Sequence, residues 1–355
     1  MRPRLKGPVL AVSSAVLFGA STPVAKRLLG EISPWALAGL LYLGAGIGLA
    51  VWWLLPLARR RREARLARAH LGVLAAVVLS GGIIAPVLLM LGLAALPAST
   101  VALLLNLEGV FTLAIAWVIF REHVDLRIGS GAAAILLGAA ILSWPRHGAA
   151  FTGGVLFGWS ATLAVAGACL AWAIDNNLTR KLSVADPLQV AAIKDLISGA
   201  VNVGLALTLG ARIASPAAAL ATASVGFIGY GLSLVLFMLA LRNVGTARTA
   251  AYFSLAPFIG AGLAIPLLGE PLSWGLCLAA ALMALGLWAH LTERHEHEHE
   301  HEPTVHEHAH VHDEHHQHAH AGHDPSGEPH SHVHAHARLL HAHPHFPDIH
   351  HRHGH

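Results

Sequence analysis

Ten apolar segments, each long enough to cross a lipid bilayer, follow one another along the chain before a polar tail begins. A membrane-spanning helix needs about 20 consecutive, mostly apolar residues. Charged residues make up only 12% of the chain, against about 25% in soluble domains. The sequence therefore predicts an all-α integral membrane protein with ten transmembrane helices. The expected spans are residues 8–29, 34–57, 71–95, 98–120, 126–144, 153–179, 187–210, 218–241, 247–269 and 272–291.

Lysine and arginine gather in alternate loops, which predicts the orientation. Cytoplasmic loops carry an excess of these residues, so we place the N-terminus in the cytoplasm. Sixteen basic residues then lie inside, and Lys26, Arg27, Arg146 and Arg212 lie outside. We expect a multi-pass protein of the plasma (inner) membrane with both termini cytoplasmic and a retained first helix. These basic loops explain the pI of 9.1, so no nucleic-acid partner is expected.

The two halves of the apolar region resemble each other in sequence. "LGLAALPASTVALLLNLEGVF" from Leu91 aligns with "LALRNVGTARTAAYFSLAPFI" from Leu239, and "STPVAKRLL" from Ser21 aligns with "DNNLTRKLS" from Asp175. Five spans per repeat is an odd number, so the second repeat enters the membrane inverted. Inverted repeats are typical of alternating-access carriers, whose substrate site lies between the halves. The expected division is 1–147 and 148–294 for the repeats and 295–355 for the tail.

This pattern resembles the EamA-like family of the drug/metabolite transporter superfamily. The resemblance rests on "FGASTPVAK" from Phe18, "NLEGVFTLAIAWVIFRE" from Asn106 and "LAPFIGAGLAIPLLGEPLS" from Leu255. It covers about residues 8–291 and implies transport of a small solute without naming it, since family members carry diverse metabolites and drugs. Where the family often has Glu-Pro, this chain has Glu108-Gly109, which puts a proline kink in doubt.

Glu108 is the clearest functional candidate, because it falls near the middle of an expected span with Thr112 one turn away on the same face. A charge at the bilayer centre costs about 2.5–3.5 kcal/mol even on lenient scales, so such a residue needs a reason. We predict that Glu108 carries protons during transport. The alternative is a protonated side chain that bonds a neighbouring helix for structure alone.

A second candidate site comes from matching polar interruptions in the two repeats. Polar breaks at corresponding positions of two repeats indicate a carrier's binding site. Pro23 removes one backbone hydrogen bond, so we expect it to break the first span. Lys26 is expected either to bind an anionic group or to reach the membrane interface. The matched candidates are Ser21 and Thr22 with Lys26 in the first repeat, and Asp175 and Asn176 in the second.

The seventh span adds Lys194 and Asp195, which lie about 100° apart on a helix and so face different partners. A structural pair at the cytoplasmic end is an equal alternative. Trp172 and Tyr252 are candidates for the pathway lining, although aromatic residues in spans more often pack or anchor.

The C-terminal tail carries 24 of the 28 histidines, alternating with Glu, Ala or Val. Its apolar content is too low for a core, so a disordered segment is expected. Imidazole and carboxylate groups bind Zn, Ni, Co or Cu ions. The metal candidates are His295, His297, His299, His301, His306, His308, His310, His312, His315, His316, His318 and His320.

Three function classes follow from these features. The first is a secondary active transporter, in the form of proton-coupled efflux of a small organic solute, with a metal-binding regulatory tail. The second is a divalent-metal exporter, and the third a metal-binding membrane protein that transports nothing. The body has no nucleophile–base pair and no phosphate-binding glycine loop, so neither an enzyme nor a required cofactor is expected. Expected partners are a small-molecule substrate and membrane lipids, and a homodimer is compatible with the sequence.

Overall fold

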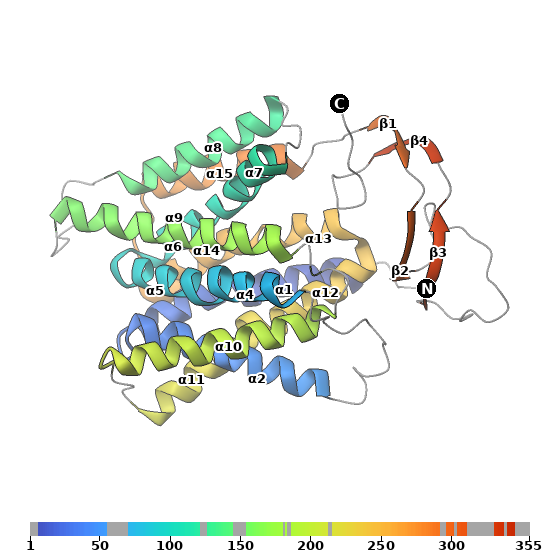
Figure 1. Ribbon diagram of the computed structural model, residues 1–355. Helices are drawn as coiled ribbons and strands as arrows, with labels where there is room; N and C mark the ends of the chain where they lie inside the picture. The colour runs from blue at the N-terminus through green and yellow to red at the C-terminus, as the bar shows by residue number, and fades with distance from the viewer. Residues whose placement is uncertain are drawn as a thin grey trace.

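The computed structural model is a bundle of long helices with a smaller strand region at one end (Figure 1). It describes residues 6–54, 70–120, 126–144, 154–179, 182, 186–211, 215–291, 296–301, 304–310, 330–336 and 339–344. The first repeat holds α1 (Lys6–Leu28), α2 (Pro34–Leu54), α4 (Leu71–Val77), η2 (Val78–Ile84), α5 (Ala85–Ala95), α6 (Ala98–Leu104), α7 (Leu107–Phe120) and α8 (Leu126–Ser143). The second holds α9 (Gly154–Thr179), α10 (Pro187–Thr208), α11 (Pro216–Gly226), η4 (Phe227–Leu232), α12 (Ser233–Val244), α13 (Thr246–Phe253), α14 (Ala256–Leu268) and α15 (Trp274–Leu291).

Nine helical segments among the described residues are long and apolar enough to cross a membrane. The 26-residue helix α9 lies beside them and packs against α5 and α7. An all-α membrane fold is confirmed, while the count of ten spans stays a prediction. α1 runs through Pro23 without a break, unlike the interruption expected there.

Two of the expected spans are broken in the middle. The segment 98–120 divides into α6 and α7 at a turn over Leu105 and Asn106, and the segment 247–269 divides into α13 and α14 at Ser254 and Leu255. α14 has Pro257 in its first turn, whereas α7 has Gly109 at the corresponding place. The first break therefore forms without a proline.

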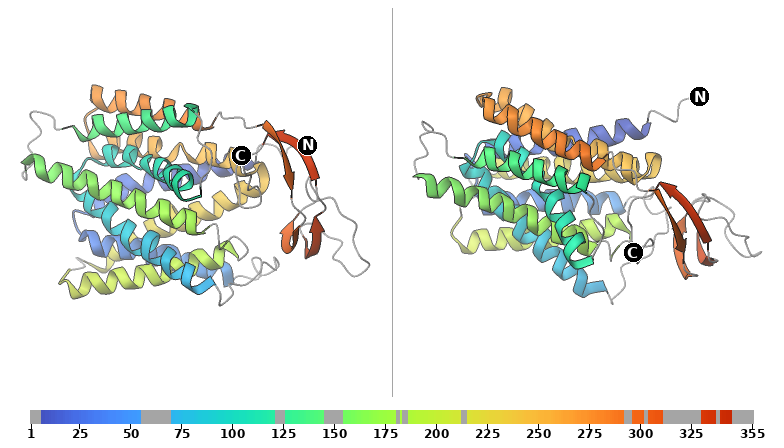
Figure 2. Two further views of the ribbon diagram at one scale, coloured as in Figure 1. Left: turned by 45° about the horizontal axis from the view of Figure 1, so that its top comes forward. Right: turned by 90° about the horizontal axis from the view of Figure 1, so that it is seen from above.

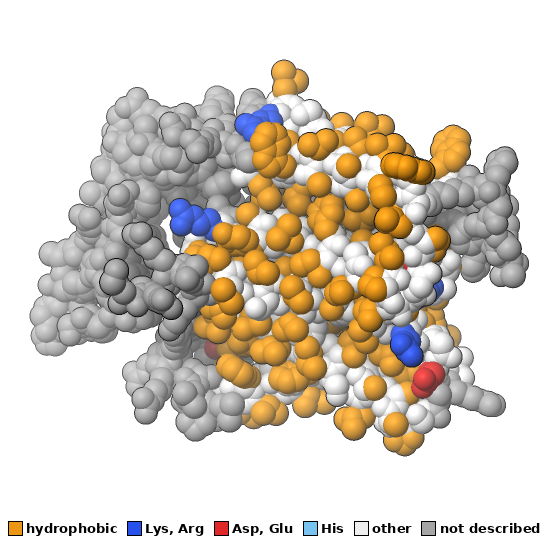
Figure 3. Space-filling model, turned by 180° about the vertical axis from the view of Figure 1, so that it is seen from behind, with side chains coloured by type: hydrophobic (Ala, Val, Ile, Leu, Met, Phe, Trp, Pro, Cys, Tyr) orange, Lys and Arg blue, Asp and Glu red, His pale blue; other side chains and the backbone are white. Residues whose placement is uncertain are grey.

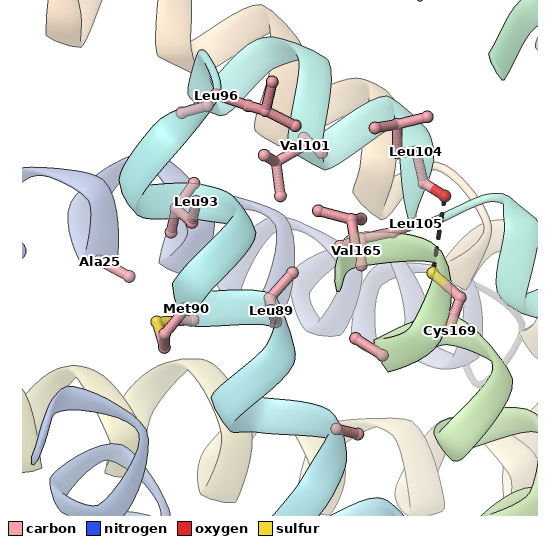
Figure 4. Packing of buried hydrophobic residues seen from close by; sticks show 14 of the residues in the cluster. Ala25, Leu89, Met90, Leu93, Leu96, Val101, Leu104, Leu105, Val165 and Cys169 are labelled. Atoms are coloured by element: carbon pink, nitrogen blue, oxygen red, sulfur yellow. Dashed lines mark hydrogen bonds between the residues drawn. The ribbon is translucent and has the colours of Figure 1, made fainter. Parts of the chain in front are cut away.

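Small residues let the helices approach closely where lipid supplies no hydrophobic driving force. The most extensive packing joins α2 to α10 and α8 to α15. A Cβ atom on Gly39 or Gly46 of α2 would lie only 2.6 Å from a backbone nitrogen of α10. Elsewhere α5, α6 and α9 share a buried cluster that includes Leu93, Leu104 and Cys169, whose Sγ lies 3.6 Å from Leu104 O (Figure 4).

The outer surface matches a lipid environment. Hydrophobic side chains cover the middle of the face in Figure 3, and the few charged side chains on it lie towards its two ends. Large apolar side chains such as Val118 and Leu163 are among the exposed ones. Because lipid tails solvate such groups as well as a protein core does, their exposure is expected in a membrane.

Part of the histidine-rich tail is extended, which differs from the disordered segment expected. β1 (Glu296–His301) pairs antiparallel with β4 (Leu339–Pro344), and β2 (Thr304–His310) pairs with β3 (His330–His336). The period-two alternation of these segments suits a strand, in which successive residues face opposite sides. The strands lie at the end of the bundle where α1 begins (Figure 2).

Candidate functional site

The break between α6 and α7 places Glu108 in the interior of the bundle. Glu108 stands in the first turn of α7, where free backbone N–H groups favour a carboxylate. Asn176 Nδ2 donates to Glu108 Oε1 at 2.7 Å. The carboxylate is half-buried and joins α7 to α9 in the middle of the expected span.

Next to this contact lies an ion pair between α9 and α10. Lys194 Nζ lies 2.6 Å from Asp175 Oδ2, and Thr179 Oγ1 donates to Asp175 Oδ1 at 3.1 Å. The Asp175 side chain is almost fully buried. Glu108, Asp175, Asn176 and Lys194 form what we call the charged cluster.

The charged cluster sits against η2, the π-helical turn of the third span. A Cβ atom on Gly81 would overlap the Asp175 carboxylate, so only glycine leaves room for it. Tyr42 OH and Trp172 Nε1 each donate to Gly81 O at 3.0 Å, and Asn202 Nδ2 donates to Gly82 O at 3.2 Å. π-Helical turns inside α-helices often mark functional sites.

A second π-helical turn, η4, lies in the eighth span, 148 residues further along the sequence. A Cβ atom on Gly229 would lie 2.7 Å from Ser21 Cβ, so Ser21 covers Gly229 as Asp175 covers Gly81. Ser21 Oγ donates to Phe18 O at 2.6 Å. Polar residues that the sequence aligned between the repeats therefore face equivalent turns.

Aromatic side chains from both repeats line another part of this interior. The rings of Phe18 and Tyr230 have centroids 5.5 Å apart, as do those of Phe18 and Phe253, and Tyr42 lies 5.8 Å from Tyr230. We call Phe18, Tyr42, Tyr230 and Phe253 the aromatic wall. Tyr42 brings the wall to η2 beside the charged cluster, because its hydroxyl group donates to the carbonyl oxygen of Gly81, the residue against which Asp175 packs.

Of the residues singled out from the sequence, the structure brings together Glu108, Asp175, Asn176, Lys194 and Trp172. Asp195 is buried nearby on α10. Thr22 is buried in α1, Thr112 lies one turn along α7 from Glu108, and Tyr252 precedes Phe253 in α13.

Lys26 has a different place from the one expected. Its ammonium group donates to Leu93 O at 2.6 Å, Leu96 O at 3.0 Å and Ala94 O at 3.2 Å, at the C-terminus of α5. A cation there complements the helix dipole. In this conformation Lys26 holds the α5–α6 turn rather than an anionic ligand.

Sequence reasoning missed Tyr42, which helps to hold η2 in place, and Tyr230 of the aromatic wall. The adjacent glycines Gly81 and Gly82 within an apolar run were the available signal, because such pairs permit close approach. Nothing in the sequence linked them to Asp175.

No group of three or more histidine, cysteine, aspartate or glutamate residues suited to a metal occurs within the part of the chain whose side chains are described. Of the predicted metal candidates, His297, His299, His301, His306, His308 and His310 fall in β1 and β2, while His295, His312, His315, His316, His318 and His320 lie outside the described residues.

Comparisons with known proteins agree with this architecture. The sequence profile of the EamA-like transporter family matches twice, over residues 5–144 and 159–292. A protein of Methanothermobacter thermautotrophicus named an uncharacterized transporter is 29% identical over 301 residues, covering 80% of this chain and 85% of that protein. A solved crystal structure aligns with a TM-score of 0.58 at 18% identity over 81% of this chain and 98% of that one, a likeness in fold alone.

Proposed function

Because the chain belongs to the EamA-like transporter family and is therefore a membrane transporter, we propose that it is a secondary active carrier of a small organic solute, coupled to protons and working as an exporter. The observation that carries this proposal is the charged cluster. A carboxylate at Glu108, bonded by one amide, lies beside the Asp175–Lys194 ion pair inside an apolar bundle. Uncompensated charge in a membrane is costly and is kept where ions or substrates pass.

In this proposal α9 also crosses the membrane, as the sixth of ten spans, and the two repeats are related by inversion about an axis in the membrane plane. The broken spans α6–α7 and α13–α14 support it, because carriers of this kind bind substrate at discontinuous helices near the midplane. Alternating access would then expose the charged cluster first to one side and then to the other.

Glu108 is the proposed proton carrier. A carboxyl group that loses its proton when the cavity opens to one side, and regains it on the other, couples the two gradients. Asn176 can serve both forms, since its amide donates to the carboxylate and its carbonyl oxygen accepts from the protonated acid.

We further propose that the carrier lies in the plasma membrane with both termini in the cytoplasm, where the tail binds divalent transition metals and modulates transport. The excess of basic residues in the expected inner loops supports this orientation. Export of the metal itself is the second candidate, and the observation that favours it is the run of alternating histidines at the end of the chain.

The test is proton-driven solute flux in proteoliposomes with Glu108→Gln. This change keeps the size of the side chain and removes its titration, so flux driven by a pH gradient should be lost while solute exchange without a gradient persists. Glu31→Gln, at an exposed position between α1 and α2, is the matched control and should behave as the wild type. Unchanged pH-driven flux in Glu108→Gln would remove the coupling role of this residue.

A further inference from the structure

One face of α10 carries three buried side-chain oxygens in a row. Asp195, Ser198 and Asn202 are three and four residues apart, so they lie on the same side of the helix. Asp195 is 7% exposed and the other two are 0% exposed. We call these three residues the oxygen stripe.

The oxygen stripe is short of donors. Ser198 Oγ and Asn202 Oδ1 are buried and have no hydrogen-bond partner among the described residues, although Asn202 Nδ2 is used by the carbonyl groups of η2. Asp195 is buried one residue beyond Lys194 on the same helix. A buried acceptor without a donor costs about 1–3 kcal/mol, so a row of them calls for an explanation.

The charges beside the stripe leave an excess of acid. Lys194, the basic member of this region, is already paired with Asp175 at 2.6 Å. Glu108 has an amide as its hydrogen-bond partner, and Asp195 shares the charge of Lys194 with Asp175. An anionic substrate would have to break the Lys194–Asp175 pair, whereas a cation would meet carboxylates whose charge is not yet compensated.

The aromatic wall meets the oxygen stripe at η2. Tyr42 of the wall and Asn202 of the stripe donate to adjacent carbonyl groups of η2, Gly81 O at 3.0 Å and Gly82 O at 3.2 Å. Tyr230 packs against Phe18 at 5.5 Å. Aromatic faces attract cations and also bury the apolar body of a ligand. Acceptors and rings therefore converge from α10 on one side and from α1, α2 and η4 on the other.

We propose that the substrate is an organic cation whose charge is carried by N–H groups, such as a protonated primary amine, on an aromatic or other apolar body. The oxygen stripe supplies the acceptors for its N–H groups, and the aromatic wall receives its body. This inference rests on the proposed transport function and narrows it to one class of solute.

The requirement for N–H donors separates this class from quaternary ammonium ions, which carry the same charge but have no N–H group to donate in a hydrogen bond. The test is calorimetric titration of the full-length protein with four probes of one shape: 2-phenylethylamine, its N,N,N-trimethyl derivative, phenylalanine and 3-phenylpropionate. We expect 2-phenylethylamine to bind at least tenfold more tightly than each of the other three. Equal affinity for the trimethyl derivative, or tighter binding of 3-phenylpropionate, would overturn the inference.

Two variants locate the site. Asp195→Asn should weaken 2-phenylethylamine at least tenfold, and Ser198→Ala should weaken it about threefold while leaving the trimethyl derivative unchanged. Ser224→Ala, an exposed serine bonded to its own helix at 2.8 Å, is the control and should change neither affinity. If Asp195→Asn leaves the affinity of 2-phenylethylamine unchanged, the stripe does not bind it. If either variant fails to fold, the order of affinities for the four probes, measured on the unmodified protein, still tests the proposed substrate class.

Flux measurements distinguish a failure of this substrate assignment from a failure of the proposed carrier function. Glu108-dependent flux of 3-phenylpropionate, without flux of the amine, would overturn the substrate class and leave the carrier function standing. Selective binding of 2-phenylethylamine without flux of any probe would overturn the carrier function and leave the site chemistry standing.

Discussion

Replacing Gly81 by alanine (Gly81→Ala) puts a methyl group where the Asp175 carboxylate lies. The new Cβ would overlap that carboxylate and would lie 2.6 Å from Asp175 Cβ, 0.8 Å short of the 3.4 Å at which ordinary contact begins. Asp175 cannot simply rotate away, because Lys194 at 2.6 Å and Thr179 at 3.1 Å both hold it. Either η2 moves or the ion pair opens.

The magnitude follows from which of these gives way. Overpacking a well-packed interior costs about 1–3 kcal/mol. Opening a buried ion pair costs about 3–5 kcal/mol, because a charge is left without its partner. We therefore expect Gly81→Ala to lower the free energy of unfolding by about 3 kcal/mol or more and to abolish transport.

The assay is unfolding in mixed micelles, followed by circular dichroism. Gly204→Ala is the matched control, since no atom lies within 4 Å of the added Cβ. Alanine there should stabilise the helix by up to about 1 kcal/mol. A Gly81→Ala protein as stable as Gly204→Ala would refute the reasoning, because the contact with Asp175 would then carry no energy.

Three further predictions concern the ends of the bundle. Glu270→Gln should destabilise the protein by about 1 kcal/mol in the same unfolding assay. The reason is that Glu270 accepts hydrogen bonds from Ala98 N at 2.6 Å and Ser99 N at 2.9 Å, at the start of α6. An unchanged stability would mean that the negative charge of Glu270 does not stabilise this helix end. A reporter enzyme fused after Arg294 should be active only if it is a type that works in the cytoplasm, and activity of a reporter that works only outside would reverse the expected topology. Truncation after Arg294 should leave solute flux within a few-fold of the full chain and remove its modulation by Zn²⁺ or Ni²⁺; if flux is lost, the tail belongs to the pathway.

The spans could be predicted because the bilayer itself sets their length and composition. The uninterrupted helices α2, α8 and α10 begin and end within a few residues of the expected bounds. The turn at Asn106 was not predicted, since its neighbours on both sides are as apolar as any helix interior. Such a break depends on packing between helices, which hydropathy does not record.

The ionisable residues of the site could be predicted from the sequence, but their contacts with one another could not. Glu108 and Asp175 stood out because carboxylates are rare in spans. Lys26 stood out for the same reason, yet it caps α5, because a cation near a span's end can satisfy free carbonyl groups as well as a ligand. The sequence places a charge along a helix, and the neighbouring helices decide what that charge meets.

The two π-helical turns occupy equivalent positions in the two halves but differ in the side chains that bond to their carbonyl groups. In η2, the carbonyl group of Gly81 receives both Tyr42 OH and Trp172 Nε1, and Asn202 binds the next carbonyl group. These three donors come from three different helices. They satisfy the carbonyl groups that a π-turn leaves poorly bonded, and so they fix the third span to its surroundings.

The corresponding donors are missing around η4. Sequence offsets of 153 or 154 residues pair Tyr42 with Asp195, Trp172 with Phe18 and Asn202 with Leu49. Phe18 and Leu49 have no polar hydrogen to give, and a carboxylate at Asp195 accepts rather than donates. Among the described residues, the eighth span therefore keeps its π-turn without these three donors, and Ser14 Oγ donates to Ser233 O at 2.7 Å where η4 ends. The two halves therefore hold their π-turns by different contacts, and the eighth span also supplies Tyr230 to the proposed substrate site.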